Sequence, residues 1–243
     1  MQKLLFGIFA HPDDEGFGPS GTLLKMAQNG TDVHLICITR GDAGSNPDNA
    51  SDLGALREQE WRNAGALIGA KSMHCLGFKD GTLSNNVYHE IASQIETIIR
   101  DTIQQYDTDV SLECMTFDTT GLSGHLDHIA TSMIAHYVFV KLRQAYSGDT
   151  SVHFKRMWQF CIESSDFDHN IGFVYAPAGR LKQELHFIND VSDVLPQKLA
   201  IMQAHHSQRA DADWHITHRH EQLKKECFRF AFDKSTKSTG QEF

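Results

Sequence analysis

Apolar and polar positions alternate in blocks along this chain. Short continuous apolar runs are separated by longer segments in which apolar residues recur at helical spacing. The runs predict strands over residues 3–10, 32–40, 73–78, 109–117 and 152–162, and the periodic segments predict helices over 20–30, 53–69, 87–106 and 125–146. Strand–helix alternation of this kind predicts an α/β fold with a mostly parallel sheet and helices on both faces.

The pattern weakens after about residue 165. Residues 173–177 and 184–190 are candidate further strands, and a helix is predicted to begin near Pro196 and continue toward residue 208. The polar, turn-rich stretch 42–52 is predicted to be a loop. Because no linker, repeat or low-complexity segment interrupts the chain, we expect a single domain over residues 1–243, with a frayed tail from about residue 233.

Charge and composition exclude several classes of protein. The net charge of -9, without a Lys/Arg cluster longer than Lys224–Lys225, argues against a nucleic-acid partner. No apolar run approaches the roughly 20 residues of a membrane span, and the short N-terminal run lacks a signal-peptide cleavage site. The five cysteines are far apart and form no CxxC pair, which predicts buried reduced thiols and a cytoplasmic protein.

Three adjacent acids follow the first predicted strand in the segment HPDDE. Like charges repel at such short spacing, and a divalent cation would relieve that repulsion. His11 and Asp14 form an imidazole–carboxylate pair of the kind that binds zinc, and Asp13 between them could act as a general base. The alternative is that the acids only flank the N-terminus of a helix, where negative charge is favourable.

A second cluster, GHLDH at residues 124–128, opens the helix after the fourth predicted strand. His128 can supply a third metal ligand, His125 is then available to face the substrate, and Asp127 can orient or stabilise an imidazole. Both clusters follow strands of one parallel sheet, so we expect them at its carboxyl edge, where ligands bind in such folds. Three ligands suit a catalytic zinc, and ferrous iron would fit nearly as well.

A glycine pattern offers a competing interpretation. Residues 16–21 spell GxGxxG, and Asp42 follows about 20 residues later, as in a dinucleotide-binding fold. Five residues separate the strand from the glycines, however, and three of them are acids that would repel a pyrophosphate. We therefore predict an ordinary turn into a helix with Ser20 as its N-cap.

Six segments together resemble the PIG-L/LmbE-like family of zinc-dependent N-acetylglucosamine-type deacetylases. Their order and spacing match over most of residues 4–208, and the segments are AHPDDE, CITRGDAGS, LREQEWRNAGALIGA, LGFKDGTL and KLAIMQAHHSQ, with GHLDH as a sixth. The resemblance implies a Rossmann-like three-layer sandwich that hydrolyses the N-acetyl group of an amino sugar or its conjugate. It also implies possible homo-oligomers, trimers or hexamers, since family members often form them.

The resemblance further implies roles for individual residues. The zinc ligands would be His11, Asp14 and His128. Asp13 would deprotonate the zinc-bound water that attacks the amide, and His125, as an imidazolium kept charged by Asp127, would stabilise the oxyanion. The proton for the leaving amine would come from Asp13 or His125.

Arg57 and Asp80 match positions that contact sugar hydroxyls in sugar-acting members. The alternatives are an i,i+3 ion pair between Arg57 and Glu60, and a turn role for Asp80 before a glycine. The chain departs from the family pattern at Leu126, where proline is usual, and at Ser123, where some members carry tyrosine. Among the tryptophans, Trp214 is the best candidate for stacking on a substrate.

Two other functions remain open at this stage. A metal-dependent amidase acting on a non-sugar N-acyl compound would use the same ligands, and only a substrate panel would separate the two. A non-catalytic nucleotide- or sugar-binding module would instead tolerate Asp13→Asn without a measurable effect.

Overall fold

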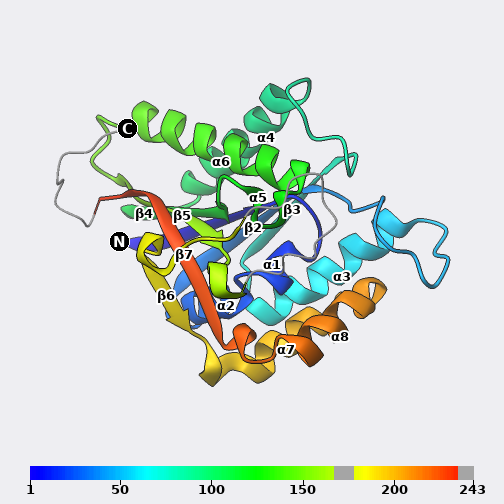
Figure 1. Ribbon diagram of the computed structural model, residues 1–243. Coiled ribbons are helices and arrows are strands. Elements are labelled where there is room, and N and C mark those ends of the chain that lie inside the picture. Colours follow the sequence, from blue (N-terminus) through cyan, green and yellow to red (C-terminus); the bar gives the residue numbers. More distant parts are fainter. Residues whose placement is uncertain (167–177, 235–243) are drawn as a thin grey trace.

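The computed structural model describes residues 1–166 and 178–234 (Figure 1). The strands are β1 Gln2–Phe9, β2 Thr31–Thr39, β3 Ser72–Phe78, β4 Val110–Phe117, β5 Val152–Cys161, β6 Phe187–Asp190 and β7 Lys225–Asp233. The α-helices are α1 Asp14–Phe17, α2 Ser20–Gln28, α3 Leu53–Ile68, α4 Tyr88–Ile103, α5 Gly121–Gly124, α6 Leu126–Ala145, α7 Leu195–Gln203 and α8 Arg209–His218. Short 3₁₀ helices are η1 Ser164–Asp166, η2 Lys182–Glu184, η3 Ser192–Val194, η4 His206–Gln208 and η5 Gln222–Lys224.

The strands form one seven-stranded sheet in the order β3-β2-β1-β4-β5-β7-β6. The first five strands pair in parallel, and β7 pairs antiparallel with both β5 and β6. The predicted mostly parallel α/β sheet is therefore confirmed. The predicted strand at 173–177 and most of the predicted frayed tail, from residue 235 onward, lie outside the described residues.

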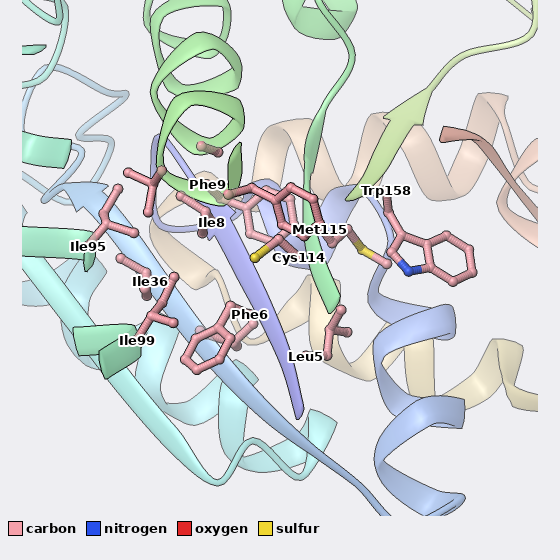
Figure 2. Packing of buried hydrophobic residues seen from close by; sticks show 14 of the residues in the cluster. Leu5, Phe6, Ile8, Phe9, Ile36, Ile95, Ile99, Cys114, Met115 and Trp158 are labelled. Atoms are coloured by element: carbon pink, nitrogen blue, oxygen red, sulfur yellow. The ribbon is translucent and has the colours of Figure 1, made fainter. Parts of the chain in front are cut away.

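Helices cover both faces of the sheet. Figure 1 shows α4 and α6 on one side and α2, α3 and α7 on the other, in agreement with the contacts within each group. The central strands are apolar because a parallel sheet with two covered faces exposes neither face to water. Figure 2 shows the resulting core, in which Ile95 and Ile99 of α4 pack near Ile36 of β2 and Phe6 of β1.

Two elements near the C-terminus were not predicted from the sequence. The helix α8 buries only Ala212 along its ten residues. It therefore lacks the apolar stripe from which an amphipathic helix is predicted. The strand β7 lacks the continuous apolar run of the parallel strands, and its far half is only partly buried. Its register depends on β5 and β6, which are distant in sequence.

The prediction that Ser20 caps α2 is wrong. Ser20 is the first helical residue, and its hydroxyl donates a hydrogen bond back to the Gly16 carbonyl at 2.8 Å. The N-terminal amides of α2 are instead bound by the buried Glu226 carboxylate of β7, at 2.9 Å from Gly21 N and 2.7 Å from Thr22 N. Because a carboxylate occupies these amides, they are not available to a pyrophosphate, which agrees with rejecting the dinucleotide interpretation.

All five cysteines are free thiols, and four of them are buried. The predicted burial is therefore found for four of the five, and Cys75 is half-buried. Among the helices of the described part of the chain, none is both long enough and apolar enough to cross a bilayer.

Candidate metal-binding and catalytic site

The two charged clusters meet at the carboxyl edge of the sheet, between β1 and β4. The chain runs outward from β1 through β2 to β3 and then returns to place β4 on the other side of β1. This reversal of strand order leaves a crevice beyond the strand ends. The segment after β1 supplies His11, Asp13 and Asp14, and the segment after β4 supplies His125, Asp127 and His128.

The three predicted metal ligands converge. His11 Nδ1 lies 3.2 Å from His128 Nε2 and 3.5 Å from Asp14 Oδ2, and His128 Nε2 lies 3.1 Å from Asp14 Oδ1. A tetrahedral zinc with ligand bonds of about 2.0–2.1 Å requires neighbouring donor atoms about 3.3 Å apart. The observed separations are close to that value, with Asp14 Oδ2 facing His11 and Asp14 Oδ1 facing His128, so these residues are suitably placed to hold a zinc-sized cation.

Neighbouring groups aim both imidazoles at the same point. His128 Nδ1 lies 3.2 Å from the Gly121 carbonyl, which can only accept, so Nδ1 can donate to it while Nε2 faces Asp14 and His11. His11 Nε2 lies 3.1 Å from Asp80 Oδ1 and 3.4 Å from Asp127 Oδ2, so Nδ1 is the ring nitrogen that faces His128 and Asp14. Such outer contacts are typical of histidines that bind a metal.

The electrostatics of the site favour a positive charge. Burial alone would lower the pKa of His11, but contacts with Asp127, Asp14 and Asp80 raise it well above its usual value. Burial would raise the pKa of Asp14, yet His128 and His11 hold it well below its usual range. A cluster of buried carboxylates that stabilises a protonated imidazole would also stabilise a divalent cation in its place.

Asp13 adopts a backbone conformation that is unfavourable for a residue with a side chain. Its φ angle is 143°, which costs about 1–3 kcal/mol and is typical of functional sites. The turn is held because Asp14 Oδ2 accepts from the backbone amides of Ala10 and His11, at 3.1 and 2.7 Å. Burial raises the pKa of Asp13 to about 6, against the opposing effect of the Arg57 guanidinium.

Arg57 is a buried residue that is already bound on several sides. Its guanidinium donates to Asp13 Oδ2 at 2.8 Å, to the Pro12 carbonyl at 2.9 Å and to the Gly41 carbonyl at 2.7 Å. A Cβ at Gly41 or Gly44 would lie 2.6 Å or less from guanidinium atoms, so these glycines make room for it. Glu60, the alternative partner considered from the sequence, instead accepts hydrogen bonds from Ser207.

His125 forms the N-cap of α6, where its Nδ1 accepts a hydrogen bond from Asp127 N at 3.2 Å. An accepting Nδ1 places the ring proton on Nε2. Burial, followed by the effects of His128 and His11, lowers the pKa of His125, which favours the neutral imidazole. This differs from the imidazolium that the family resemblance implied. The Asp127 carboxylate accepts from the Gly81 and Leu83 amides at 2.8 and 3.0 Å, and approaches His11.

Behind the site lies a buried layer whose roles the sequence did not reveal. His205 Nε2 lies 3.1 Å from Glu15 Oε1, and both side chains are almost fully buried. This pair links the residue before η4 to α1, the short helix that begins at Asp14. The sequence signal for it was the segment KLAIMQAHHSQ, one of the segments that resemble the family.

The site opens into a cavity of about 920 Å³. Seven of the eight predicted site residues line it; Asp127 lies beneath the surface. Leu126, the position at which the family usually has proline, is the exposed first residue of α6, so its side chain forms no buried contact that a proline would lose.

Comparison with known proteins gives consistent results. A family profile described as "PIG-L: GlcNAc-PI de-N-acetylase" matches residues 6–139, which contain all eight candidate site residues. A probable N-acetyl-alpha-D-glucosaminyl L-malate deacetylase 2 of Bacillus anthracis is 26% identical over 208 residues, covering 84% of this chain and 80% of the relative. Diacetylchitobiose deacetylase of Thermococcus kodakarensis is 26% identical over 216 residues, covering 88% and 73%.

A solved structure supports the fold independently. N,N'-diacetylchitobiose deacetylase from Pyrococcus horikoshii superposes with a TM-score of 0.68 at 21% sequence identity, covering 94% of this chain and 83% of that one. The Rossmann-like three-layer architecture expected from the sequence is thereby confirmed.

Proposed function

Because this chain belongs to the PIG-L family, we propose that it is a metal-dependent hydrolase that removes the N-acetyl group from an N-acetylglucosamine-type sugar or its conjugate. The observation that carries the proposal is the convergence of His11, Asp14 and His128 at zinc-compatible distances, beside the strained and buried Asp13. The deacetylases named among the relatives support the reaction class.

Zinc is the cofactor that we propose for His11, Asp14 and His128, with ferrous iron as an alternative for the same ligands. When bound, such a cation polarises the amide carbonyl and makes a water molecule more acidic. The choice between metals is tested by metal analysis of protein purified without added metal, followed by reconstitution of the chelated protein with each ion.

In the proposed reaction, Asp13 accepts a proton from the water that attacks the acetyl carbon. Its raised pKa suits a group that must both take up and release a proton near neutral pH. We propose that Asp13 then delivers this proton to the leaving amine. The neutral His125, with its proton on Nε2, would donate a hydrogen bond to the oxyanion of the tetrahedral intermediate.

For Arg57 and Asp80 the contacts support positioning roles in addition to any contact with sugar. Arg57 holds Asp13, and Asp80 holds His11. Asp127 also approaches His11, so we propose that it orients His11 rather than keeping His125 charged.

The reaction is tested by measuring free-amine release from a panel of N-acetylglucosamine conjugates with the zinc-loaded protein. The expected result is release of one amine per acetate formed. A panel without turnover, with metal confirmed at the site, would contradict the sugar deacetylase function. Release from N-acylated amino acids or amines alone would favour the alternative, a metal-dependent amidase acting on a non-sugar compound.

Replacing Asp80 by asparagine is expected to weaken zinc binding about 10- to 100-fold, the usual cost of losing an outer contact to a histidine ligand. The amide is a poorer acceptor for His11 Nε2–H, so the imidazole is less well oriented and less basic. Competition with a chromogenic chelator measures the affinity. Asp32→Asn, at a surface ion pair with Lys71, is the matched control and should bind zinc as the wild type does.

Replacing Arg57 by lysine is expected to lower kcat about 100-fold while zinc content stays unchanged. A lysine ammonium cannot reproduce the planar guanidinium that donates to Asp13 and to two backbone carbonyls. Asp13 would then be displaced, and small displacements of a reacting group can lower kcat by about 100-fold. Steady-state kinetics and metal analysis on the same preparation check the prediction. A rise in KM with unchanged kcat would instead indicate that Arg57 only binds substrate.

We further propose that the chain acts as one domain, because strands from Gln2 to Asp233 join a single sheet. Its free cysteines suit a reducing compartment such as the cytoplasm. The expected partner is a small amino-sugar substrate. Assembly into trimers or hexamers remains a prediction, which analytical ultracentrifugation would decide.

A further inference from the structure

The cavity extends well beyond the residues that carry the proposed reaction. Its volume of about 920 Å³ lies near the upper end of the roughly 300–1,000 Å³ that holds drug-sized ligands. One part of its lining consists of the proposed metal ligands and Asp13. Another part, here called the α8 end, consists of residues of α8, η5, the start of β7 and the chain after β5. The cavity therefore has room for a group attached to the amino sugar.

Aromatic side chains contribute to the lining of the cavity. Phe17 lies at the end of α1, one turn after the ligand Asp14, and its ring is 5.9 Å from the ring of His215 on α8. The next lining residue, Trp214, leaves 41% of its surface exposed. Its indole is held by His218, at 5.4 Å between ring centroids, and by the Arg219 guanidinium at 5.6 Å. A fixed indole in a cavity wall is suited to packing against a ring.

The lysines at this end already have carboxylate partners. Lys225 Nζ lies 2.7 Å from Glu163 and 2.8 Å from Asp166. Lys198 Nζ lies 2.6 Å from the buried Glu226. Neither lysine can bind a carboxylate or phosphate without giving up an existing ion pair, which would offset most of the gain.

The remaining charges on the α8 wall balance each other. Among the described residues, no carboxylate lies within salt-bridge distance of Arg219, but Asp211 lines the same wall and carries the opposite charge. Burial lowers the pKa of His215, and the Arg219 guanidinium acts in the same direction, so His215 adds no positive charge at neutral pH. The wall thus offers hydrogen-bonding groups and an aromatic surface without a net excess of cations.

We propose that this end of the cavity binds an uncharged, ring-containing aglycone of the amino sugar, such as a second neutral sugar, and disfavours an anionic one. This inference rests on the proposed deacetylase function, because it assigns the group carried by that enzyme's substrate. Indole packing would stabilise the ring, and Asp211 and Arg219 would bond to its hydroxyls.

The test compares glycosides of N-acetylglucosamine that differ only in the aglycone: methyl, phenyl, 4-carbamoylphenyl and 4-carboxyphenyl, in both anomeric forms. The last two are nearly isosteric and differ by one negative charge. We expect the phenyl and carbamoylphenyl glycosides to exceed the methyl glycoside in kcat/KM by about 3- to 10-fold, the range of one aromatic contact. The carboxyphenyl glycoside should be turned over more slowly than the carbamoylphenyl one.

Variants of Trp214 test whether the preference for aromatic aglycones comes from the α8 end of the cavity. Trp214→Ala should abolish the preference for the phenyl-type glycosides, mainly through KM, and should affect the methyl glycoside much less, while Trp214→Phe should retain part of the preference. Tyr137→Ala is the matched control, since this side chain is 39% exposed on α6 and does not line the cavity. It should behave as the wild type does.

Two outcomes would overturn the inference. One is faster turnover of the 4-carboxyphenyl glycoside than of the carbamoylphenyl glycoside. The other is an equal loss in Trp214→Ala on the methyl and phenyl glycosides. Calorimetric binding of the corresponding free-amine glycosides provides a readout that needs no turnover. If no glycoside is turned over but the carbamoylphenyl amine binds more tightly than the methyl and carboxyphenyl amines, the deacetylase function is contradicted and the neutral subsite is supported. Equal binding of all the amines would contradict the subsite.

Discussion

Asp13→Asn is expected to lower kcat about 10²- to 10⁴-fold, the usual contribution of one general base, and to leave the zinc content unchanged. Asparagine can still accept the hydrogen bond from Arg57, so the strained turn at Asp13 should be preserved. It cannot accept a proton from water. The measurement is free-amine release from the best substrate of the panel, with metal analysis of the same preparation.

Asp193→Asn is a suitable control for this variant. Asp193 lies in η3, where its carboxylate pairs with Lys25 at the surface, so its replacement should leave kcat unchanged. If Asp13→Asn retains wild-type activity with zinc bound, Asp13 is not the general base. A loss of zinc in Asp13→Asn would show that the turn also depends on the charge of Asp13.

His11→Ala is expected to abolish both zinc binding and turnover. The substitution removes one of three converging donor atoms, and it also leaves Asp80 and Asp127 without the imidazole that they both approach. Two like charges would then remain close together in a buried site. We expect zinc below the detection limit of metal analysis after dialysis, with kcat reduced at least as far as in Asp13→Asn.

His153→Ala is the control for replacing a histidine outside the site. His153 is a half-buried residue near the start of β5, and the variant should bind zinc as the wild type does. Circular dichroism would establish that His11→Ala is folded. Stoichiometric zinc in a folded His11→Ala protein would contradict the assignment of His11 as a ligand. His128→Ala then provides an independent test, because its imidazole belongs to a different segment of the chain.

The sequence alone determined the class of fold and the edge at which the site lies. The apolar run before HPDDE and the run before GHLDH each predicted a buried strand, and parallel strands place their carboxyl ends together. The donor types in both clusters predicted a metal site. The fold prediction was confirmed because strand and helix periodicity act between residues that are neighbours in the chain. The metal site stays a prediction.

Only the tertiary structure decided which side chains meet. Arg57 reaches Asp13 across 44 positions, and Glu226 binds the α2 amides across about 205. The strand order placed β4 beside β1, and the loop after β3 then brought Asp80 to His11. Local periodicity is insensitive to strand order, whereas hydrogen bonds of about 3 Å depend on it. Hence the candidate metal ligands could be named from the sequence, while the partners that orient them became visible only once the chain was folded.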